Sequence, residues 1–445
     1  MNYLNTFWTW LISIPYLGAF LIGCVVLITI NEVIDKISGY KPLHILVTYL
    51  AKVIFFQKID RNRKRYYKTL AAEEFQTWQM NVIKKLYGEQ NLVSLFGISY
   101  VTAVYSASGS ISDSYKNIGE LESVEIEDRI KLSGISKRYY RLMGKTIKRP
   151  DLAGFVLTTM KRNAAGEITG FVAKMATYKL NVATSHVLEF ELYLAYKKYK
   201  DRFLRFSKDQ MLNRLKMRHN IHTSQREEEI LVTGKGRYSL LGVQMLVVYL
   251  TEDDKYQVLV IKRSEDVAVR PGYHQFVPSG GFEFFEKEKE INEINIGKNF
   301  DVELALYREM VEEIFGEVEF EHNTAGNPVD NIYKHKKVVD LRTWLKEGQA
   351  NLEFLGSTVD LVTLRHELSF LLLINNKQFS MNQFKLNHEG TNFEEIDIKN
   401  LYEKFGKGTK VRLNPTSASL LKLALDNSQT LKDKIGAPSE ASVAG

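Results

Sequence analysis

Three carboxylates at helical spacing are the residues of this chain best suited to carry chemistry. Glu309, Glu312 and Glu313 stand at positions i, i+3 and i+4, so a helix would bring them to one face. Carboxylates crowded on one face repel one another, which costs stability unless a divalent cation neutralises them. Hard oxygen ligands with room for substrate phosphates suit Mg²⁺ or Mn²⁺. The alternative is an ordinary solvated helix with an Arg-Glu pair, because the pattern R-E-x-x-E-E also arises by chance.

A glycine-bearing loop, Pro278-Ser279-Gly280-Gly281-Phe282-Glu283, precedes this helix. Loop and helix together resemble the Nudix box, whose pattern is G-x5-E-x7-R-E-(apolar)-x-E-E-x-G-(apolar). Gly280 and Glu286 fit the first half of the pattern, and residues 308–313 fit the second half. Two departures occur: 21 residues separate Glu286 from Arg308 where the pattern has seven, and the closing glycine, Gly316, comes one place late.

The flanking segments follow the order of a Nudix domain. Apolar, β-rich runs at 242–250 and 257–261 precede the loop, and runs at 368–374 and 393–398 follow the helix. The resemblance covers residues 236–425 and implies a Nudix α/β/α sandwich with a mixed sheet, within an overall α+β fold class.

The resemblance also implies site residues. Glu309, Glu312 and Glu313, with the Gly280 carbonyl nearby, would hold Mg²⁺ or Mn²⁺, and Arg308 would brace the carboxylates as the fourth catalytic residue. The reaction would be the hydrolysis of a nucleoside diphosphate linked to another group. The pattern does not fix the general base; the candidates are Glu367, Glu389 and Glu394.

The amino terminus shows a different kind of signal. Residues 1–31 contain no charged side chain, and residues 7–30 are almost continuously apolar, long enough at about 1.5 Å per residue to cross a bilayer. We therefore expect a transmembrane helix over 7–30 and a juxtamembrane segment over 31–59. The basic residues from Lys58 to Lys68 predict a single pass through the bacterial inner membrane, with most of the chain in the cytosol. The single cysteine, Cys24, excludes an intramolecular disulfide.

The middle of the chain carries most of the positive charge. The chain has 445 residues and a net charge of +7, but residues 236–445 are net acidic. Residues 60–235 are predicted to form a basic α+β domain and a ligand sensor, with a helix over 73–87 and a hairpin over 154–178. Such a surface attracts anionic lipids, nucleic acid or nucleotides. The polar tail, 426–445, is predicted to be disordered.

The order of membrane helix, basic domain and Nudix-like domain resembles the membrane-Nudix effectors of bacterial CBASS anti-phage systems. The stretch Ala183-Thr184-Ser185-His186-Val187-Leu188-Glu189 adds to this resemblance. The resemblance implies that a cyclic nucleotide from a cGAS/DncV-like nucleotidyltransferase activates the protein. It also implies a nucleotide substrate, and it leaves homo-oligomer formation open. The alternatives are a constitutive membrane-bound Nudix hydrolase and a non-catalytic Nudix sensor that acts through its membrane helix.

Overall fold

The computed structural model divides the chain into two compact units, residues 1–65 and residues 66–445. It describes isolated residues between 23 and 36 and then residues 42–435, apart from 110, 112–114, 145–146, 148–150, 265–269, 271, 285–291, 317–327 and 386–389. Helix α3 (Pro42–Ala71) leads into the second unit. That unit holds every element discussed below.

The prediction of an N-terminal transmembrane helix is not supported by this structure and is corrected here. Across the residues that the structure describes, none of the helices combines the length and the apolar character needed to cross a membrane. The longest described helix, α3, carries a dense run of charged residues in its second half, which explains why it does not qualify. Most of the predicted span 7–30 lies outside the described residues. The fold class is therefore a mixed α+β fold with no transmembrane helix assigned.

An eight-stranded mixed sheet forms the centre of the second unit. Its main path runs β13–β8–β7–β12–β11–β3, with β9 paired to β8 and β10 paired to β7. Among the strand pairs that the structure describes in this sheet, β7 and β12 run parallel and the other pairs are antiparallel. The predicted strands at 242–250, 257–261, 368–374 and 393–398 are confirmed, since the bounds are β7 Gly242–Leu250, β8 Tyr256–Arg263, β9 His274–Phe276, β10 Ser279–Gly281, β11 Ala350–Asp360, β12 Arg365–Ile374 and β13 Gly390–Asp397.

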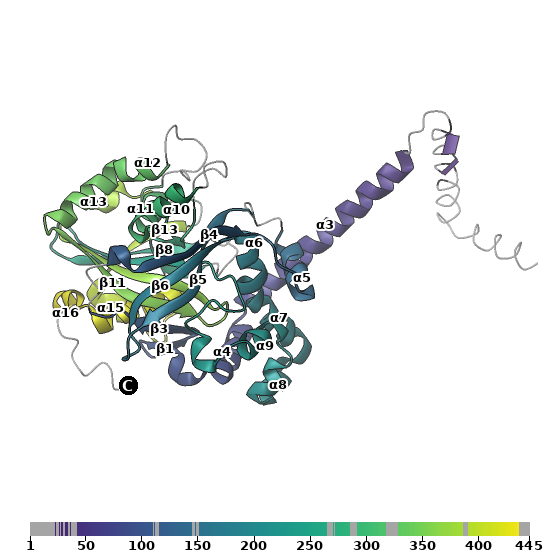
Figure 1. Ribbon diagram of the computed structural model, residues 1–445, viewed down its shortest axis with the longest axis horizontal. Helices are drawn as coiled ribbons and strands as arrows, with labels where there is room; N and C mark the ends of the chain where they lie inside the picture. The colour runs from purple at the N-terminus through teal and green to yellow at the C-terminus, as the bar shows by residue number, and fades with distance from the viewer. Residues whose placement is uncertain are drawn as a thin grey trace, which may run out of the picture. The chain divides into compact units, whose positions relative to one another are not determined.

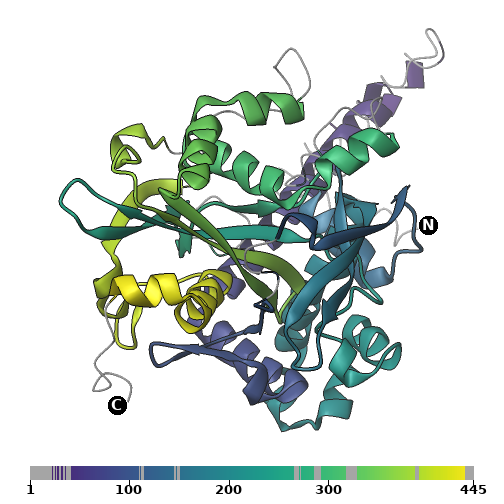
Figure 2. The same ribbon diagram turned by 60° about the vertical axis from the view of Figure 1, so that its left-hand side comes forward.

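Helices cover both faces of this sheet (Figures 1 and 2). Alternate β7 side chains point to opposite faces: Val243 and Met245 join one core cluster, and Leu246 and Val248 join another. The helices on the first face are α10 (Glu293–Asn299), α11 (Val302–Glu313), α12 (Pro328–Lys334) and α13 (Lys336–Lys346). The second face is covered by α15 (Pro415–Asn427), with α16 (Gln429–Ile435) beside it. The result is the three-layer arrangement expected for residues 236–425.

The middle segment is built into the same unit. The predicted helix is α4 (Glu73–Tyr87), and the predicted hairpin is formed by β5 (Ala153–Arg162) and β6 (Ile168–Thr177). Strand β3 (Thr102–Ser106) pairs with β11 and so belongs to the central sheet. The remaining elements are β1 Val93–Leu95, β2 Ile98–Tyr100, β4 Gly119–Glu127, α5 Gly134–Met143, α6 Tyr178–Asn181, α7 Val187–Tyr199, α8 Lys208–Leu212, α9 Lys216–Thr223 and α14 Leu401–Phe405.

Hydrogen bonds also join the hairpin to the Nudix-like segment. Phe155 donates its backbone N–H to the Phe282 carbonyl at 2.9 Å, and Leu157 donates to the Ser239 carbonyl at 3.0 Å. The division predicted at residues 235 and 236 therefore describes the order of segments along the chain, and not two separately packed bodies.

The stretch 183–189 contains most of a turn of π-helix, Val182–His186. In this turn the hydroxyl groups of Thr184 and Ser185 donate to the carbonyls of Leu180 and Thr363, both at 2.8 Å. Residues 426–445 are predicted to be disordered, but the structure has a helix, α16, within them. Leu431 of α16 is buried in the core cluster on the second face of the sheet. Residues 436–445 lie outside the described residues.

The pairing of β3 with β11 depends on Gly356. Its φ is +132°, and a Cβ added there would lie 2.0 Å from the Tyr105 carbonyl oxygen. We predict that Gly356→Ala lowers the free energy of unfolding by about 3 kcal/mol, because the added carbon forces the two strands apart. Urea denaturation of the purified chain measures this loss.

Gly348→Ala is the matched control. Gly348 also has a positive φ, +72°, but a Cβ there meets no atom within 4 Å. It should cost only the backbone strain, about 1 kcal/mol. Equal losses in the two variants would show that strand separation at Gly356 contributes nothing.

Candidate active site

Helix α11 carries the predicted acidic residues. Asp301 caps its start by accepting from the backbone N–H groups of Glu303 and Leu304 at 2.9 and 3.3 Å. Its apolar residues pack in the core of the first sheet face. Glu309 and Glu313 are buried, whereas Glu312 is partly exposed. The helix expected from the sequence is therefore present, with two of its three carboxylates turned inward.

The glycine loop lies directly against these two carboxylates. Strand β10 pairs with β7, and the backbone N–H of Ser279 donates to Glu313 Oε2 at 2.7 Å. A Cβ added to Gly280 would lie within 2.1 Å of the carboxyl atoms of Glu309. Only glycine lets the loop approach Glu309 this closely. The glycine loop and the acidic helix, which the sequence pattern pairs, are therefore in direct contact.

Arg308 joins helix and loop. It is 4% exposed, donates to the Gly281 carbonyl at 2.7 Å, and contacts the Glu309 carboxylate. Its Nη1 lies 3.8 Å from Glu283 Oε2. Burial by itself would lower the pKa of Arg308, but the carboxylates of Glu309, Glu312 and Glu283 outweigh it and raise that pKa. Arg308 thus connects α11 to the glycine loop.

The donors fit a divalent cation in kind but are not gathered around one point. Carboxylates and the Gly280 carbonyl are hard oxygen ligands, as Mg²⁺ and Mn²⁺ require. Within the described part of the chain, however, no three His, Cys, Asp or Glu side chains come together as a metal-binding group. Glu309 instead contacts Arg308, and Glu313 contacts the Ser279 amide. The predicted meeting of Glu309, Glu312 and Glu313 is thus not seen.

Two residues of β12 also reach the glycine loop. A Cβ added to Gly242 would lie 2.8 Å from Arg365 Nη2, 2.9 Å from Glu367 Cγ and 3.2 Å from the Gly280 carbonyl oxygen. These groups therefore converge on the space that Gly242 leaves open. Arg365 Nη2 itself lies 3.4 Å from the Gly280 carbonyl oxygen. Arg365 was missed in the sequence, although two charged residues at period two beside an apolar strand are a detectable signal.

Glu367 is the best placed of the three candidate bases. Glu389 lies outside the described residues. Glu394 accepts from Lys404 at 2.6 Å and pairs with His274 at 3.2 Å; although burial acts to raise its pKa, these hydrogen bonds lower it, which weakens it as a base. Burial raises the pKa of Glu367, whereas Arg365 and a hydrogen bond of the carboxyl group with Thr416 oppose this shift. One carboxyl oxygen, Oε2, is buried without a hydrogen-bond partner. Leaving a buried carboxylate oxygen without a hydrogen bond costs stability, and such groups are concentrated at functional sites.

Comparisons with known proteins give Nudix enzymes as structural neighbours. A Nudix hydrolase from Alicyclobacillus acidocaldarius is 16% identical, covers 44% of this chain and 95% of its own, and has a TM-score of 0.27. A MutT/nudix family protein from Enterococcus faecalis is 15% identical over 45% of this chain and 68% of its own (TM-score 0.25). An Ap4A hydrolase from C. elegans is 15% identical over 42% and 96% (TM-score 0.21). Similarity at this level carries no argument about activity. No family model and no curated protein matches the chain.

The raised pKa of Glu367 predicts a pH dependence of stability. The folded state holds the Glu367 proton more tightly than the unfolded state, so its contribution to stability falls as pH rises from the ordinary glutamate pKa of about 4.3 toward the raised folded value. We predict that Glu367→Gln removes this decline, so that the variant gains stability relative to the wild type as pH rises above about 4.3. Urea midpoints measured across that range test this, and a constant difference at all pH values would contradict it.

Proposed function

We propose that this chain is a Nudix-type hydrolase that cleaves a nucleoside diphosphate linked to another group. The observation that carries the proposal is the contact of Glu309 and Glu313 of α11 with the glycine loop, locked by Arg308. The order of strand, glycine loop, acidic helix and closing strand supports it. The structural neighbours are consistent with it, but they are too distant to add weight.

Each side chain of the site has a role in this proposal. Glu309, Glu312 and Glu313, with the Gly280 carbonyl, would hold Mg²⁺ or Mn²⁺. When bound, that ion would supply polarisation of a diphosphate oxygen and activation of water. Arg308 holds the acidic helix against the loop. Arg365, beside Gly280, donates to an oxygen of the diphosphate, and Glu367 accepts a proton from the attacking water.

Charge-neutral variants of the acidic helix test the hydrolase proposal. Glu312→Gln and Glu313→Gln should each lower Mg²⁺-dependent hydrolysis by about 10²–10³-fold, because each removes a charge from the metal-binding face. The measurement is nucleotide release from dinucleoside polyphosphates and nucleoside-diphosphate sugars. The control is Glu403→Gln, the same change on the exposed face of α14, which should keep full activity. Unchanged hydrolysis in both helix variants would refute the proposal.

A ligand sensor without hydrolysis is the second candidate. It is favoured by one observation, namely that the described carboxylates of α11 do not form a three-ligand metal group. It predicts tight binding of a nucleotide with no Mg²⁺-dependent turnover in the wild-type chain. The same assays therefore separate the two candidates.

We further infer that the activity is switched on by a cyclic nucleotide, as in the CBASS effectors that the chain resembles. The support is the order of a basic middle segment and a Nudix-like segment, together with the stretch 183–189. The expected membrane helix no longer contributes to this inference. The partner would be a cGAS/DncV-like nucleotidyltransferase.

Co-expression in bacteria tests this inference. Expressed alone, the chain should be harmless; with an active cyclic-nucleotide synthase it should stop growth. A catalytically dead synthase is the matched control and should leave growth unaffected. Growth arrest by the chain alone, without any signal, would rule out gating by a cyclic nucleotide.

A further inference from the structure

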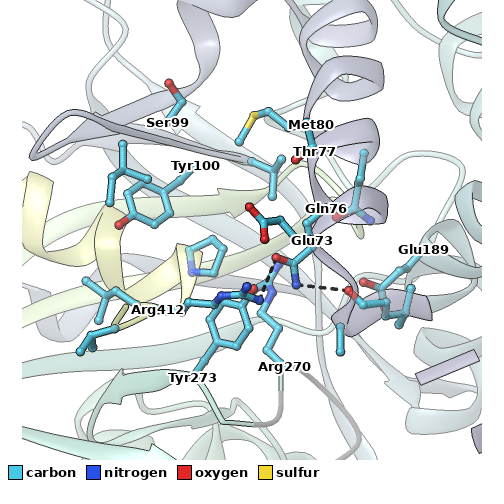
Figure 3. Close-up of a pocket in the computed structure, with 18 of the residues that line it drawn as sticks. Glu73, Gln76, Thr77, Met80, Ser99, Tyr100, Glu189, Arg270, Tyr273 and Arg412 are labelled. Atoms are coloured by element: carbon cyan, nitrogen blue, oxygen red, sulfur yellow. Dashed lines mark hydrogen bonds between the residues drawn. The ribbon is translucent and has the colours of Figure 1, made fainter. Parts of the chain in front are cut away.

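A cavity of about 510 Å³ opens in the second unit, away from the glycine loop. It is lined by α4, β2, the end of α3, residues 409–415 and the segment that contains Arg270 and Tyr273 (Figure 3). Neither the glycine loop nor α11 contributes a residue to its lining. Its size is that of pockets which enclose small ligands, for which about 300–1,000 Å³ is typical.

Two arginines, Arg270 and Arg412, line this cavity together with two carboxyl groups, those of Glu73 and Glu189. Arg270 donates to Asn414 Oδ1 at 2.8 Å and to Asp360 Oδ2 at 3.3 Å, and its φ is +48°. A non-glycine residue in the left-handed region costs about 1–3 kcal/mol and persists where its position is useful. Arg412 is exposed, and its Nη1 lies 3.4 Å from Gln76 Oε1, a long contact that an anion can replace (Figure 3).

Aromatic and apolar side chains complete the walls. Tyr100 is 7% exposed, and Tyr273 lies near the two arginines (Figure 3). Burial, with a smaller effect from Tyr273, raises the pKa of Tyr100 to about 12, so its hydroxyl stays a hydrogen-bond donor. Rings that lie beside guanidinium groups suit a ligand with a planar base and a phosphate.

Glu189 adds a polar group deep in the cavity. Glu189 lines the cavity, and its side chain is partly exposed there. Burial raises its pKa to about 7, although Arg270 opposes this shift. A carboxyl group that titrates near neutral pH both donates and accepts hydrogen bonds, as the polar edge of a nucleobase requires.

We propose that this cavity is a second binding site, for a nucleotide whose phosphate contacts Arg412 and Arg270 and whose base lies against Tyr100 and Tyr273. Charge favours the phosphate near the arginines, and the apolar walls formed by Val411 and Leu413 favour the base.

Arg270 also joins the cavity to the central sheet. It pairs with Asp360, the last residue of β11, at 3.3 Å.

Calorimetric titration of the full chain with AMP, GMP, CMP and UMP tests the binding site. At least one should bind, and Arg412→Gln should weaken it about tenfold or more, because a charge-assisted hydrogen bond is lost. Arg202→Gln, at an exposed position in Lys200–Arg205, is the matched control and should bind like the wild type. The corresponding nucleosides, which lack the phosphate, should bind more weakly than the nucleotides.

Titration of Glu313→Gln keeps this result separate from the proposed hydrolysis. Because Glu313 does not line the cavity, that variant should bind the nucleotide with unchanged affinity. Binding lost in Glu313→Gln but kept in Arg412→Gln would place the nucleotide at the glycine loop and overturn the proposal. Failure of all four nucleotides to bind at millimolar concentration would also overturn it, whether or not the chain hydrolyses anything.

Discussion

Arg308 brings a permanent positive charge into a buried position, and the surrounding structure has to balance it. A guanidinium group does not lose its proton under ordinary conditions, so its burial is tolerated only with good hydrogen bonds and nearby negative charge. The Gly281 carbonyl and the carboxylate of Glu309 supply both. Because these partners come from the loop and from the helix, the charge of Arg308 fixes the rotation of α11 about its axis. Glu309 and Glu313 then necessarily face the glycine loop.

The sheet beneath this contact explains why glycine is needed twice. A side chain at Gly280 would clash with Glu309, and a side chain at Gly242 would clash with Arg365 and Glu367. Strands β7 and β12 are parallel and in register, with Gly242 opposite Glu367, so charged side chains of one strand lie over bare backbone of the other. Gln244 in this layer is hydrogen-bonded, because it donates to Thr358 and Ser369 at 2.9 Å each. Glu367 Oε2 lacks a hydrogen bond, as do Nε of Arg365 and Nε2 of His366, so three buried polar atoms without a hydrogen bond follow one another at the start of β12.

Local signals allowed much of this fold to be predicted. The spacing of apolar residues gave α4 with its observed bounds, and β-rich runs gave β7, β8 and β12, because each pattern follows from the element itself. The pairing of β3 with β11 was not predictable, since the partners are about 250 residues apart and neither sequence specifies the other. Arg308, Glu309 and Glu313 were predictable as a motif. The convergence of Arg365 and Glu367 on Gly242 was not, because it depends on a register between two strands far apart in the chain.

The pairing of β3 with β11 also constrains how a ligand in the cavity could act on the candidate active site. Strand β3 is tied to α15 through Ser419, which donates to Thr102 at 2.6 Å, and α15 begins beside Asn414, the partner of Arg270. The cavity wall and the edge strand β3 therefore belong to one compact unit and are joined through α15, whose first residue, Pro415, lines the cavity. A rigid-body movement between sensor and catalytic domains has no boundary at which to occur there. A direct contact between the cavity and the central sheet is the ion pair of Arg270 with Asp360, the last residue of β11, at 3.3 Å. A negative charge bound at Arg270 would therefore act on the sheet through this pair.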